Sequence, residues 1–261
     1  KPNDIIVDAP VSYWDPSSKK MWKPTNYEKR FFGRVTLQRS LEHSINVATI
    51  RLLEKVGTRR VSGLVKRLGV LSPIEPYLSM ALGTSVVNLL EMTSAYATIA
   101  NGGLRTAPYT IQRVETADGR NLFEREARIT RALDPETAYL MAHMLRGVVE
   151  RGTGRKAKVL DRPLAGKTGT TQKLVDGHYS NEKHVASFTG FLPAENPRIV
   201  ITVVVDEPIT KGVGYGGLVA APSFRKIAEE LVAYLGIEPR ETANASSINR
   251  SGKILTMNNS Q

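Results

Sequence analysis

Apolar residues recur every three or four positions through several long stretches of this chain. That spacing places them along one face of a helix. It predicts helices over residues 36–56, 59–68, 88–100, 134–149 and 222–235. The first stretch is interrupted at residues 43–46, where the polar run His-Ser-Ile-Asn indicates a helix break or a new helix start. Serine and asparagine both cap helices well, so Ser44 and Asn46 have a purely structural interpretation beside any chemical one.

Other stretches have the composition of strands. In the last third, β-branched residues gather in three runs, which predict strands over residues 167–172, 185–192 and 199–205. An Asp-Gly pair at 118–119, between apolar runs at 109–115 and 121–123, predicts a hairpin. Residues 14–22 are interpreted as two extended pieces around a polar turn.

Together these segments predict a mixed α+β fold: an antiparallel sheet with helices packed on it, plus a helical subregion. Residues 1–240 are expected to belong to one domain. Residues 241–261 are rich in Asn, Ser and Thr, and we expect them to form a disordered tail.

Composition narrows the classes of function. The 261 residues are 41% hydrophobic and 23% charged, which is ordinary for a globular domain. The net charge of +11 favours anionic partners, but the basic residues occur as scattered pairs and no nucleic-acid-binding motif accompanies them. A Gly-x-Gly-x-x-Gly string at residues 212–217 matches the dinucleotide fingerprint, yet no second parallel strand with an acidic end follows it. We therefore expect neither nucleic acid nor a nucleotide as a ligand.

Metal chemistry is not expected either. The chain has no cysteine, and its four histidines form no metal-binding pattern such as His-Glu-x-x-His. No metal and no cofactor are predicted.

The most distinctive chemistry lies in the predicted strand that contains Lys167-Thr168-Gly169-Thr170. A lysine supplies a point charge suited to a carboxylate, and Thr168 and Thr170 add hydroxyl donors. Gly169 allows another backbone to come close, and a strand edge here can pair with an extended peptide. The backbone N–H after the glycine can stabilise an oxyanion if a nucleophile lies opposite. Taken alone, the tripeptide is equally compatible with a solvated loop.

Together with Ser44-Ile45-Asn46, this strand resembles the transpeptidase domain of penicillin-binding proteins, the enzymes that cross-link bacterial peptidoglycan. The family's Ser-x-Asn and Lys-Thr-Gly motifs occur here in the expected order and at the expected wide separation. The resemblance extends from about residue 5 to about residue 236, and it implies the fold shared by penicillin-binding proteins and serine β-lactamases.

Further stretches also carry the resemblance. Residues 81–85, 95–103 and 151–154 are similar to the bifunctional class A proteins, whereas residues 206–208 and 215–217 are closer to the monofunctional class B proteins.

One departure concerns the nucleophile, which in this family belongs to a Ser-x-x-Lys motif upstream of Ser-x-Asn. Three such strings begin here at Ser17, Ser180 and Ser223, and none has both the right order and a helix behind it. The resemblance implies that the nucleophile precedes Lys1. We therefore expect the chain to be the C-terminal part of a catalytic domain, without its nucleophile and inert alone.

The resemblance also implies roles for individual residues. Ser44 would relay protons and hydrogen-bond towards Lys167, and Asn46 would bind the substrate amide. Lys167, Thr168 and Thr170 would hold the terminal carboxylate, while Gly169 lies among them. The N–H of Thr170 would form half of the oxyanion hole.

The implied reaction is peptidoglycan D,D-transpeptidation by serine acyl transfer from D-Ala-D-Ala donors, which β-lactams inhibit. The implied partners are stem peptides, β-lactams and cell-wall synthesis proteins, with a membrane-anchored parent on the extracytoplasmic face of the membrane. A D,D-carboxypeptidase and a non-catalytic muropeptide- or β-lactam-binding module remain alternatives.

Overall fold

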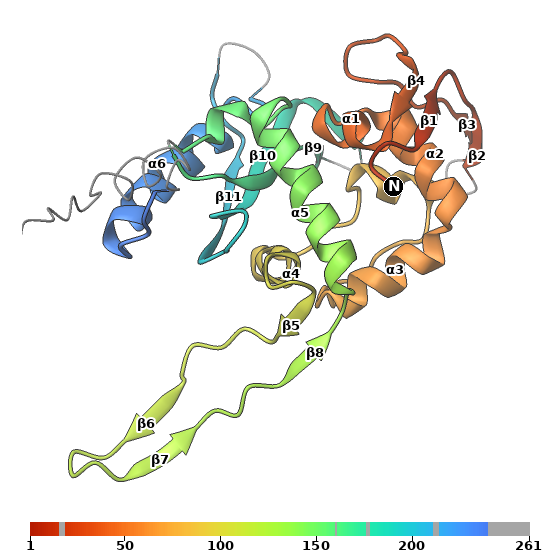
Figure 1. The fold of residues 1–261 in the computed structure, drawn as a ribbon. Coiled ribbons are helices and arrows are strands. Elements are labelled where there is room, and N and C mark those ends of the chain that lie inside the picture. Colours follow the sequence, from red (N-terminus) through yellow and green to blue (C-terminus); the bar gives the residue numbers. More distant parts are fainter. Residues whose placement is uncertain (16–18, 160, 176–177, 211–213, 240–261) are drawn as a thin grey trace, which may run out of the picture.

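The computed structural model describes residues 1–15, 19–159, 161–175, 178–210 and 214–239. They form a body in which helices pack on a three-stranded antiparallel sheet, a region of helices and short strands beside it, and a long arm that projects from the body (Figure 1). The predicted α+β class is confirmed.

The helices follow the sequence pattern closely. In chain order they are α1 (Leu37–Glu42), α2 (Asn46–Val56), α3 (Thr58–Arg67), the 3-10 helix η1 (Leu78–Leu82), α4 (Leu89–Ala100), α5 (Pro135–Glu150), the 3-10 helix η2 (Arg155–Ala157) and α6 (Ala220–Tyr234). The five predicted helical stretches are confirmed, including the break between α1 and α2.

Side-chain caps explain several of these helix starts. Thr36 caps α1, Asn88 forms a capping box with Glu91 at the start of α4, and Asp134 caps α5 ahead of a proline. At α2 the capping position is Ile45, whose side chain cannot cap. The interpretation of Ser44 and Asn46 as helix caps is therefore wrong.

The strands pair mostly with near neighbours in sequence. In chain order they are β1 (Ile5–Asp8), β2 (Tyr13–Asp15), β3 (Lys20–Trp22), β4 (Gly33–Thr36), β5 (Leu104–Thr106), β6 (Arg113–Glu115), β7 (Asn121–Glu124), β8 (Ile129–Arg131), β9 (Ala165–Val175), β10 (His178–Leu192) and β11 (Ile199–Asp206). The predicted hairpin and the two extended pieces around residues 14–22 are confirmed as β6–β7 and β2–β3. The pairings β1–β4 and β5–β8 were not predicted.

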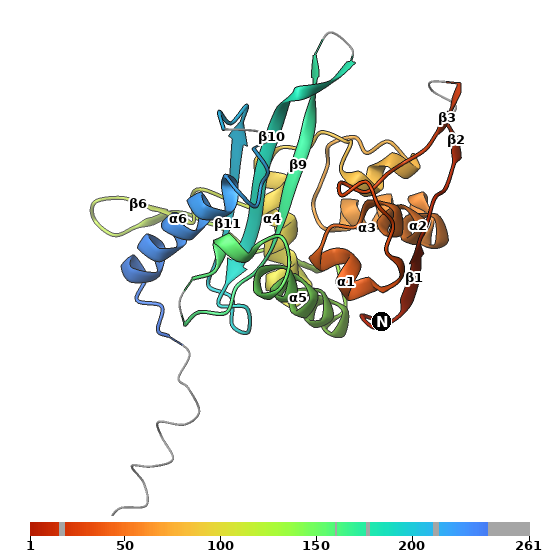
Figure 2. The same ribbon diagram turned by 90° about the horizontal axis from the view of Figure 1, so that it is seen from above.

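The main sheet has the order β11-β10-β9, all antiparallel. Strands β9 and β10 are longer than the predicted segments and extend together beyond β11 as a two-stranded ribbon (Figure 2). In the register of this pair, Lys167 lies opposite Thr189 and Thr168 lies opposite Phe188. Strand β9, which carries the predicted site, is thus an edge strand.

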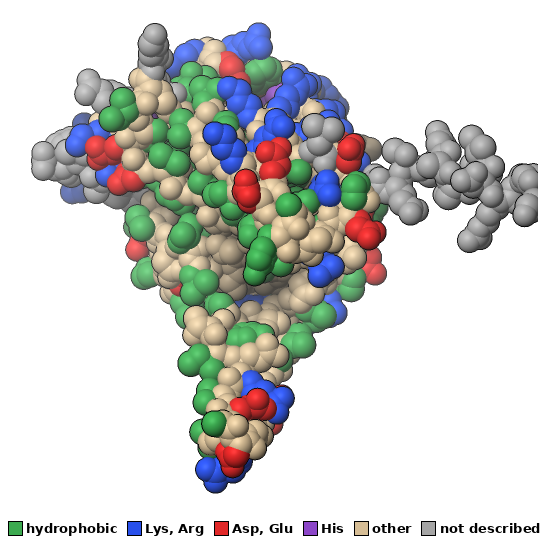
Figure 3. All heavy atoms as spheres, turned by 90° about the vertical axis from the view of Figure 1, so that its left-hand side faces the viewer, with side chains coloured by type: hydrophobic (Ala, Val, Ile, Leu, Met, Phe, Trp, Pro, Cys, Tyr) green, Lys and Arg blue, Asp and Glu red, His purple; other side chains and the backbone are tan. Residues whose placement is uncertain are grey.

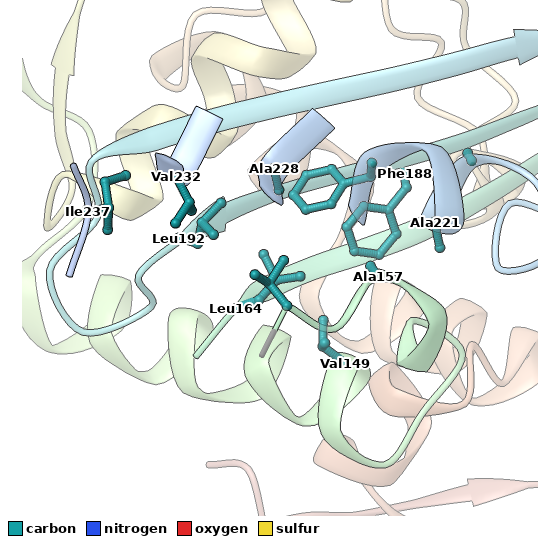
Figure 4. Packing of buried hydrophobic residues seen from close by; sticks show 12 residues of the cluster. Val149, Ala157, Leu164, Phe188, Leu192, Ala221, Ala228, Val232 and Ile237 are labelled. Atoms are coloured by element: carbon teal, nitrogen blue, oxygen red, sulfur yellow. The ribbon is translucent and has the colours of Figure 1, made fainter. Parts of the chain in front are cut away.

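Alternation along β10 directs its side chains to the two faces of the sheet. Phe188 and Leu192 enter an apolar cluster with α6 (Figure 4). In this cluster the Phe188 and Phe224 rings pack edge to face, with their centroids 4.7 Å apart. Phe191 lies on the opposite face, in a cluster with Leu145 of α5. The sheet is therefore held between α6 on one side and α4 and α5 on the other.

The arm, residues 107–128, leaves the body through the β5–β8 pair and ends in the β6–β7 hairpin. Figure 3 shows it projecting from the body with hydrophobic side chains along its surface. Its strand begins at Arg113 rather than at the predicted Tyr109, whose ring instead lies 4.5 Å beneath the guanidinium of Arg125. The turn is made at Gly119, which adopts a φ of 85°.

The predicted tail, residues 241–261, lies outside the described residues. Among the described helices, none is both long and apolar enough to cross a membrane.

Candidate active site

Ser44 and Lys167, 123 residues apart in sequence, meet in the fold. The ammonium group of Lys167 donates a short hydrogen bond to the Ser44 hydroxyl. Ser44 lies in the turn between α1 and α2, and Lys167 lies on the edge strand β9. The structure therefore brings together the two motifs that the sequence placed far apart, at the contact that the resemblance implied.

The Ser44 turn has an unusual backbone. Ser44 has a φ of 54°, a left-handed conformation that is rare outside glycine and is found at functional sites when surrounding contacts maintain it. Those contacts are backbone hydrogen bonds: Ile45 N–H donates to the Ser40 carbonyl at 2.9 Å, and Thr153 N–H donates to the Glu42 carbonyl at 3.1 Å. The turn is thus supported both by its own helix and by a distant segment.

The start of α2 is fixed by a buried polar network. The Asn46 amide donates to the Thr25 carbonyl at 3.0 Å. Beside it, the Asn26 side chain accepts from Val47 N–H at 3.2 Å and donates to the Asp8 carboxylate at 2.8 Å. Asn26 and Asp8 are both buried, and no motif in the sequence pointed to them.

Lys167 has a strongly altered electrostatic environment. The side chain is half-buried, and desolvation lowers the pKa of its ammonium group to about 8. Its Nζ also donates to the Thr168 carbonyl at 3.0 Å. A lysine with this pKa is still mostly charged at pH 7.

The other predicted residues line the same strand. The Thr168 hydroxyl lies 2.7 Å from the Thr153 hydroxyl, and the Thr170 hydroxyl accepts from Gly216 N–H at 3.0 Å. The backbone of Gly216 lies so close that a Cβ there would come within 2.3 Å of the Gly169 carbonyl oxygen. The backbone approach here depends on Gly216, because a Cβ on Gly169 itself would meet the Ser187 side chain rather than another backbone.

The Gly-Thr-Gly sequence at residues 152–154 predicts an exposed loop, and this is wrong in part. Gly154 is buried, and a Cβ there would meet the Phe188 ring at 3.2 Å. A Cβ on Gly152 would lie 2.1 Å from the Glu42 carbonyl oxygen. The segment packs against the Ser44 turn because glycine leaves room for it.

An ion pair between a buried carboxylate and a half-exposed arginine accompanies this packing. The Glu42 side chain is 8% exposed and accepts from Arg151 at 2.6 Å. Burial by itself would raise the pKa of Glu42, but hydrogen bonds from Arg151 and Gln38 outweigh it, and the pKa is below its usual value. Glu42 is therefore charged at neutral pH and anchors the segment to the end of α1.

The candidate Ser-x-x-Lys serines lie elsewhere. Ser17 is outside the described residues. The Ser180 hydroxyl accepts from Lys183 N–H at 3.0 Å near the start of β10, and the Ser223 hydroxyl donates to the Val219 carbonyl at 3.1 Å in the first turn of α6. That the nucleophile lies outside this chain stays a prediction.

A family model described as "Penicillin binding protein transpeptidase domain" matches residues 74–229, more than half of the chain. The chain belongs to the penicillin-binding protein transpeptidase family. The match begins after Ser44 and Asn46, so their assignment to the site depends on the contact with Lys167 rather than on this match.

Curated relatives point to the same family. The chain is 39% identical over 213 residues to penicillin-binding protein 1A of Aquifex aeolicus, covering 80% of the chain and 27% of the relative. It is 35% identical over 229 residues to penicillin-binding protein 1A of Neisseria meningitidis, covering 84% of the chain and again 27% of the relative. These relatives are class A proteins, and the chain spans about a quarter of their length.

A solved structure is also similar. Penicillin binding protein 3 of Mycobacterium tuberculosis, in complex with ampicillin, matches with a TM-score of 0.77 and 26% identity. The match covers 93% of this chain and 59% of that one. The predicted penicillin-binding transpeptidase fold is confirmed.

Proposed function

We propose that this chain forms the carboxylate-binding and proton-relay side of a peptidoglycan D,D-transpeptidase. The observation that carries the proposal is the hydrogen bond from Lys167 to Ser44, because it joins both family motifs at one edge strand. Membership of the transpeptidase family supports a serine acyl-transfer reaction.

The proposed reaction has two steps. A serine hydroxyl from a part of the parent protein outside this chain attacks the carbonyl of a D-Ala-D-Ala peptide bond. The serine's proton passes through Ser44 to the departing nitrogen, so that D-alanine leaves with an intact amine. An amine from a neighbouring stem peptide then attacks the acyl-enzyme, forms the cross-link and releases the serine.

Residues of this chain bind the donor peptide and stabilise the oxyanion in the proposed reaction. Lys167, Thr168 and Thr170 hold the terminal carboxylate of the donor peptide, and Asn46 binds its amide. The N–H of Thr170 supplies half of the oxyanion hole. Because Lys167 is mostly charged at pH 7, its positive charge can attract the carboxylate while its N–H groups hold the Ser44 hydroxyl.

The same site would bind β-lactams, whose carboxylate corresponds to that of the donor peptide. The ampicillin complex of the similar Mycobacterium protein supports this. The relatives named penicillin-binding protein 1A support a role in cell-wall synthesis. We further propose that the parent protein is membrane-anchored on the extracytoplasmic face.

Three apolar side chains at and just before the start of α4 are largely exposed: Val86 (88%), Leu89 (53%) and Leu90 (59%). An apolar surface of this kind is normally covered by another element of the same protein or by a partner.

The test uses the full-length parent protein and a fluorescent penicillin. We expect covalent labelling of the parent, and a fall of about 100-fold or more in the labelling rate for Ser44→Ala and Lys167→Ala, the usual scale for loss of a proton-transfer or charge-stabilising group. Lys173→Ala is the matched control, because Lys173 lies on the same strand but pairs with Asp206 and Glu207.

Unchanged labelling rates in both site variants would overturn the assignment of the site. Labelling without release of D-alanine from stem peptides would favour the non-catalytic binding module. Release of D-alanine without cross-linking would favour a D,D-carboxypeptidase.

A further inference from the structure

Thr153 connects the two halves of the site. Its backbone N–H donates to the Glu42 carbonyl, two residues before Ser44, at 3.1 Å. Its hydroxyl lies 2.7 Å from the hydroxyl of Thr168, the residue after Lys167. Thr153 therefore touches the Ser44 turn with its backbone and the carboxylate-binding strand with its side chain.

The position of Thr153 is fixed from both sides. Arg151, two residues before it, forms the ion pair with the largely buried Glu42. On the other side, a Cβ on Gly217 would lie 2.5 Å from the Thr153 carbonyl oxygen, so the loop before α6 packs directly on its backbone. The backbone of Thr153 is therefore held in place, and its side chain reaches the Thr168 hydroxyl from there.

The hydroxyl of Thr168 has a specific hydrogen-bonding balance. A threonine hydroxyl has one proton and two lone pairs. The ammonium of Lys167 lies 3.5 Å from the Thr168 oxygen and donates towards it, and the Thr153 hydroxyl is close enough to donate to it as well. If both donate, the lone pairs of Thr168 are occupied, and its proton is left to donate to an acceptor on a bound ligand.

We propose that Thr153 is a positioning residue that orients the Thr168 hydroxyl as a donor to the substrate carboxylate. This inference rests on the proposed function, because the carboxylate belongs to the donor peptide or to a β-lactam. Thr153 itself does not touch the substrate. It acts through Thr168 and keeps the proton of that residue directed outward.

The experiment compares Thr153→Val with Thr153→Ser in the full-length parent protein. Valine has nearly the shape of threonine without the hydroxyl, whereas serine keeps the hydroxyl. Each variant is acylated with benzylpenicillin and with its methyl ester, which lacks the charged carboxylate, and both rates are measured by competition with a fluorescent penicillin. Thermal unfolding confirms that each variant is folded, and Thr153→Ala replaces the valine variant if that one does not fold.

We expect Thr153→Val to slow acylation by free benzylpenicillin about three- to tenfold, the effect of one net hydrogen bond, and to slow the ester less. Thr153→Ser is expected to stay within about twofold of the unmodified protein. An unchanged rate for Thr153→Val, or equal slowing with acid and ester, would overturn the positioning role while leaving the proposed function intact. Absence of labelling in the unmodified parent would overturn both.

Discussion

In the arm, contacts stay local in sequence: Arg113 pairs with Glu115, and the Thr116 hydroxyl accepts from Arg120 N–H. Arg125 reaches back only as far as Ala107, 18 positions away. At the junction between the Ser44 turn and β9, the contacting residues are far apart. Ser44 and Lys167 are 123 positions apart, and Glu42 and Arg151 are 109 apart. The same kinds of interaction, ion pairs and hydroxyl hydrogen bonds, thus occur in two very different settings.

The two regions differ in burial, and burial changes how much each contact contributes to stability. The strands of the arm are exposed along their whole length, so water competes for every polar group. At the junction, Glu42 and the face of β10 beneath it are buried, and a lost partner there leaves a group that water cannot easily reach. Equivalent substitutions should therefore cost more stability at the junction than in the arm.

The largest difference in stability loss between the two regions is expected for phenylalanine substitutions. Phe188→Ala opens a cavity in a fully buried cluster beneath the site, and we expect the free energy of unfolding to fall by about 3–5 kcal/mol. Phe123→Ala in the arm removes a side chain that is 49% exposed and should cost less than about 1 kcal/mol. Urea unfolding of the parent protein measures both, and equal losses would contradict the comparison.

The next largest difference in stability loss between the two regions is expected for arginine substitutions. Arg151→Ala leaves the Glu42 carboxylate buried without its cation, and we expect a loss of about 2 kcal/mol, because Arg151 is itself half exposed. The matched change Arg113→Ala breaks an exposed pair and should cost less than about 0.5 kcal/mol.

The Arg151 effect should depend on pH. The pKa of Glu42 is lowered in the folded protein, so the stabilisation is present above the unfolded pKa of about 4.5 and is lost as the pH falls through the lower folded pKa. Unfolding curves at pH 7 and pH 3 should therefore show a smaller Arg151→Ala effect at pH 3. An effect of the same size at both values would argue against the ion pair as its cause.

Two glycine substitutions distinguish the effect of steric crowding from the effect of backbone conformation. Gly216→Ala would place a methyl group within 2.4 Å of two backbone carbonyl oxygens, those of Gly169 and Ser187, so the loop must move away from β9. We expect penicillin labelling to slow about tenfold, since displacement of the loop disturbs the Thr170 hydroxyl. Gly119→Ala in the arm costs about 1 kcal/mol through its positive φ but should leave labelling unchanged.

The smallest expected effect concerns Lys167. Burial lowers its pKa from 10.5 to about 8, so the folded protein carries a desolvation penalty that is full below pH 8 and disappears as the pH rises towards 10.5. Lys167→Met should therefore raise stability at pH 7 by about 1 kcal/mol and change it little at pH 10.5. Thermal unfolding at the two pH values checks this, and destabilisation at pH 7 would contradict it.

Local physics explains what the sequence predicted well. Helical periodicity, the cap residues Asn88 and Asp134 and the Asp-Gly turn of the arm all act within a few residues, so the helices and the hairpin were found nearly at their observed bounds. The motifs Ser44-x-Asn46 and Lys167–Thr170 were also recognised from sequence, because they resemble the Ser-x-Asn and Lys-Thr-Gly motifs of the family.

Only the tertiary structure determined that those motifs lie side by side. No local pattern predicts that β1 pairs with β4, that Asn26 and Asp8 hold the start of α2, or that the Arg151–Gly154 segment is packed beneath the Ser44 turn. These contacts join residues tens to more than a hundred positions apart, and they form only when the sheet and helices bury their apolar faces against each other. The sequence by itself determined the chemical groups and their local structure, whereas burial in the fold set the pKa of Lys167, the conformation of Ser44 and the hydrogen bond between them.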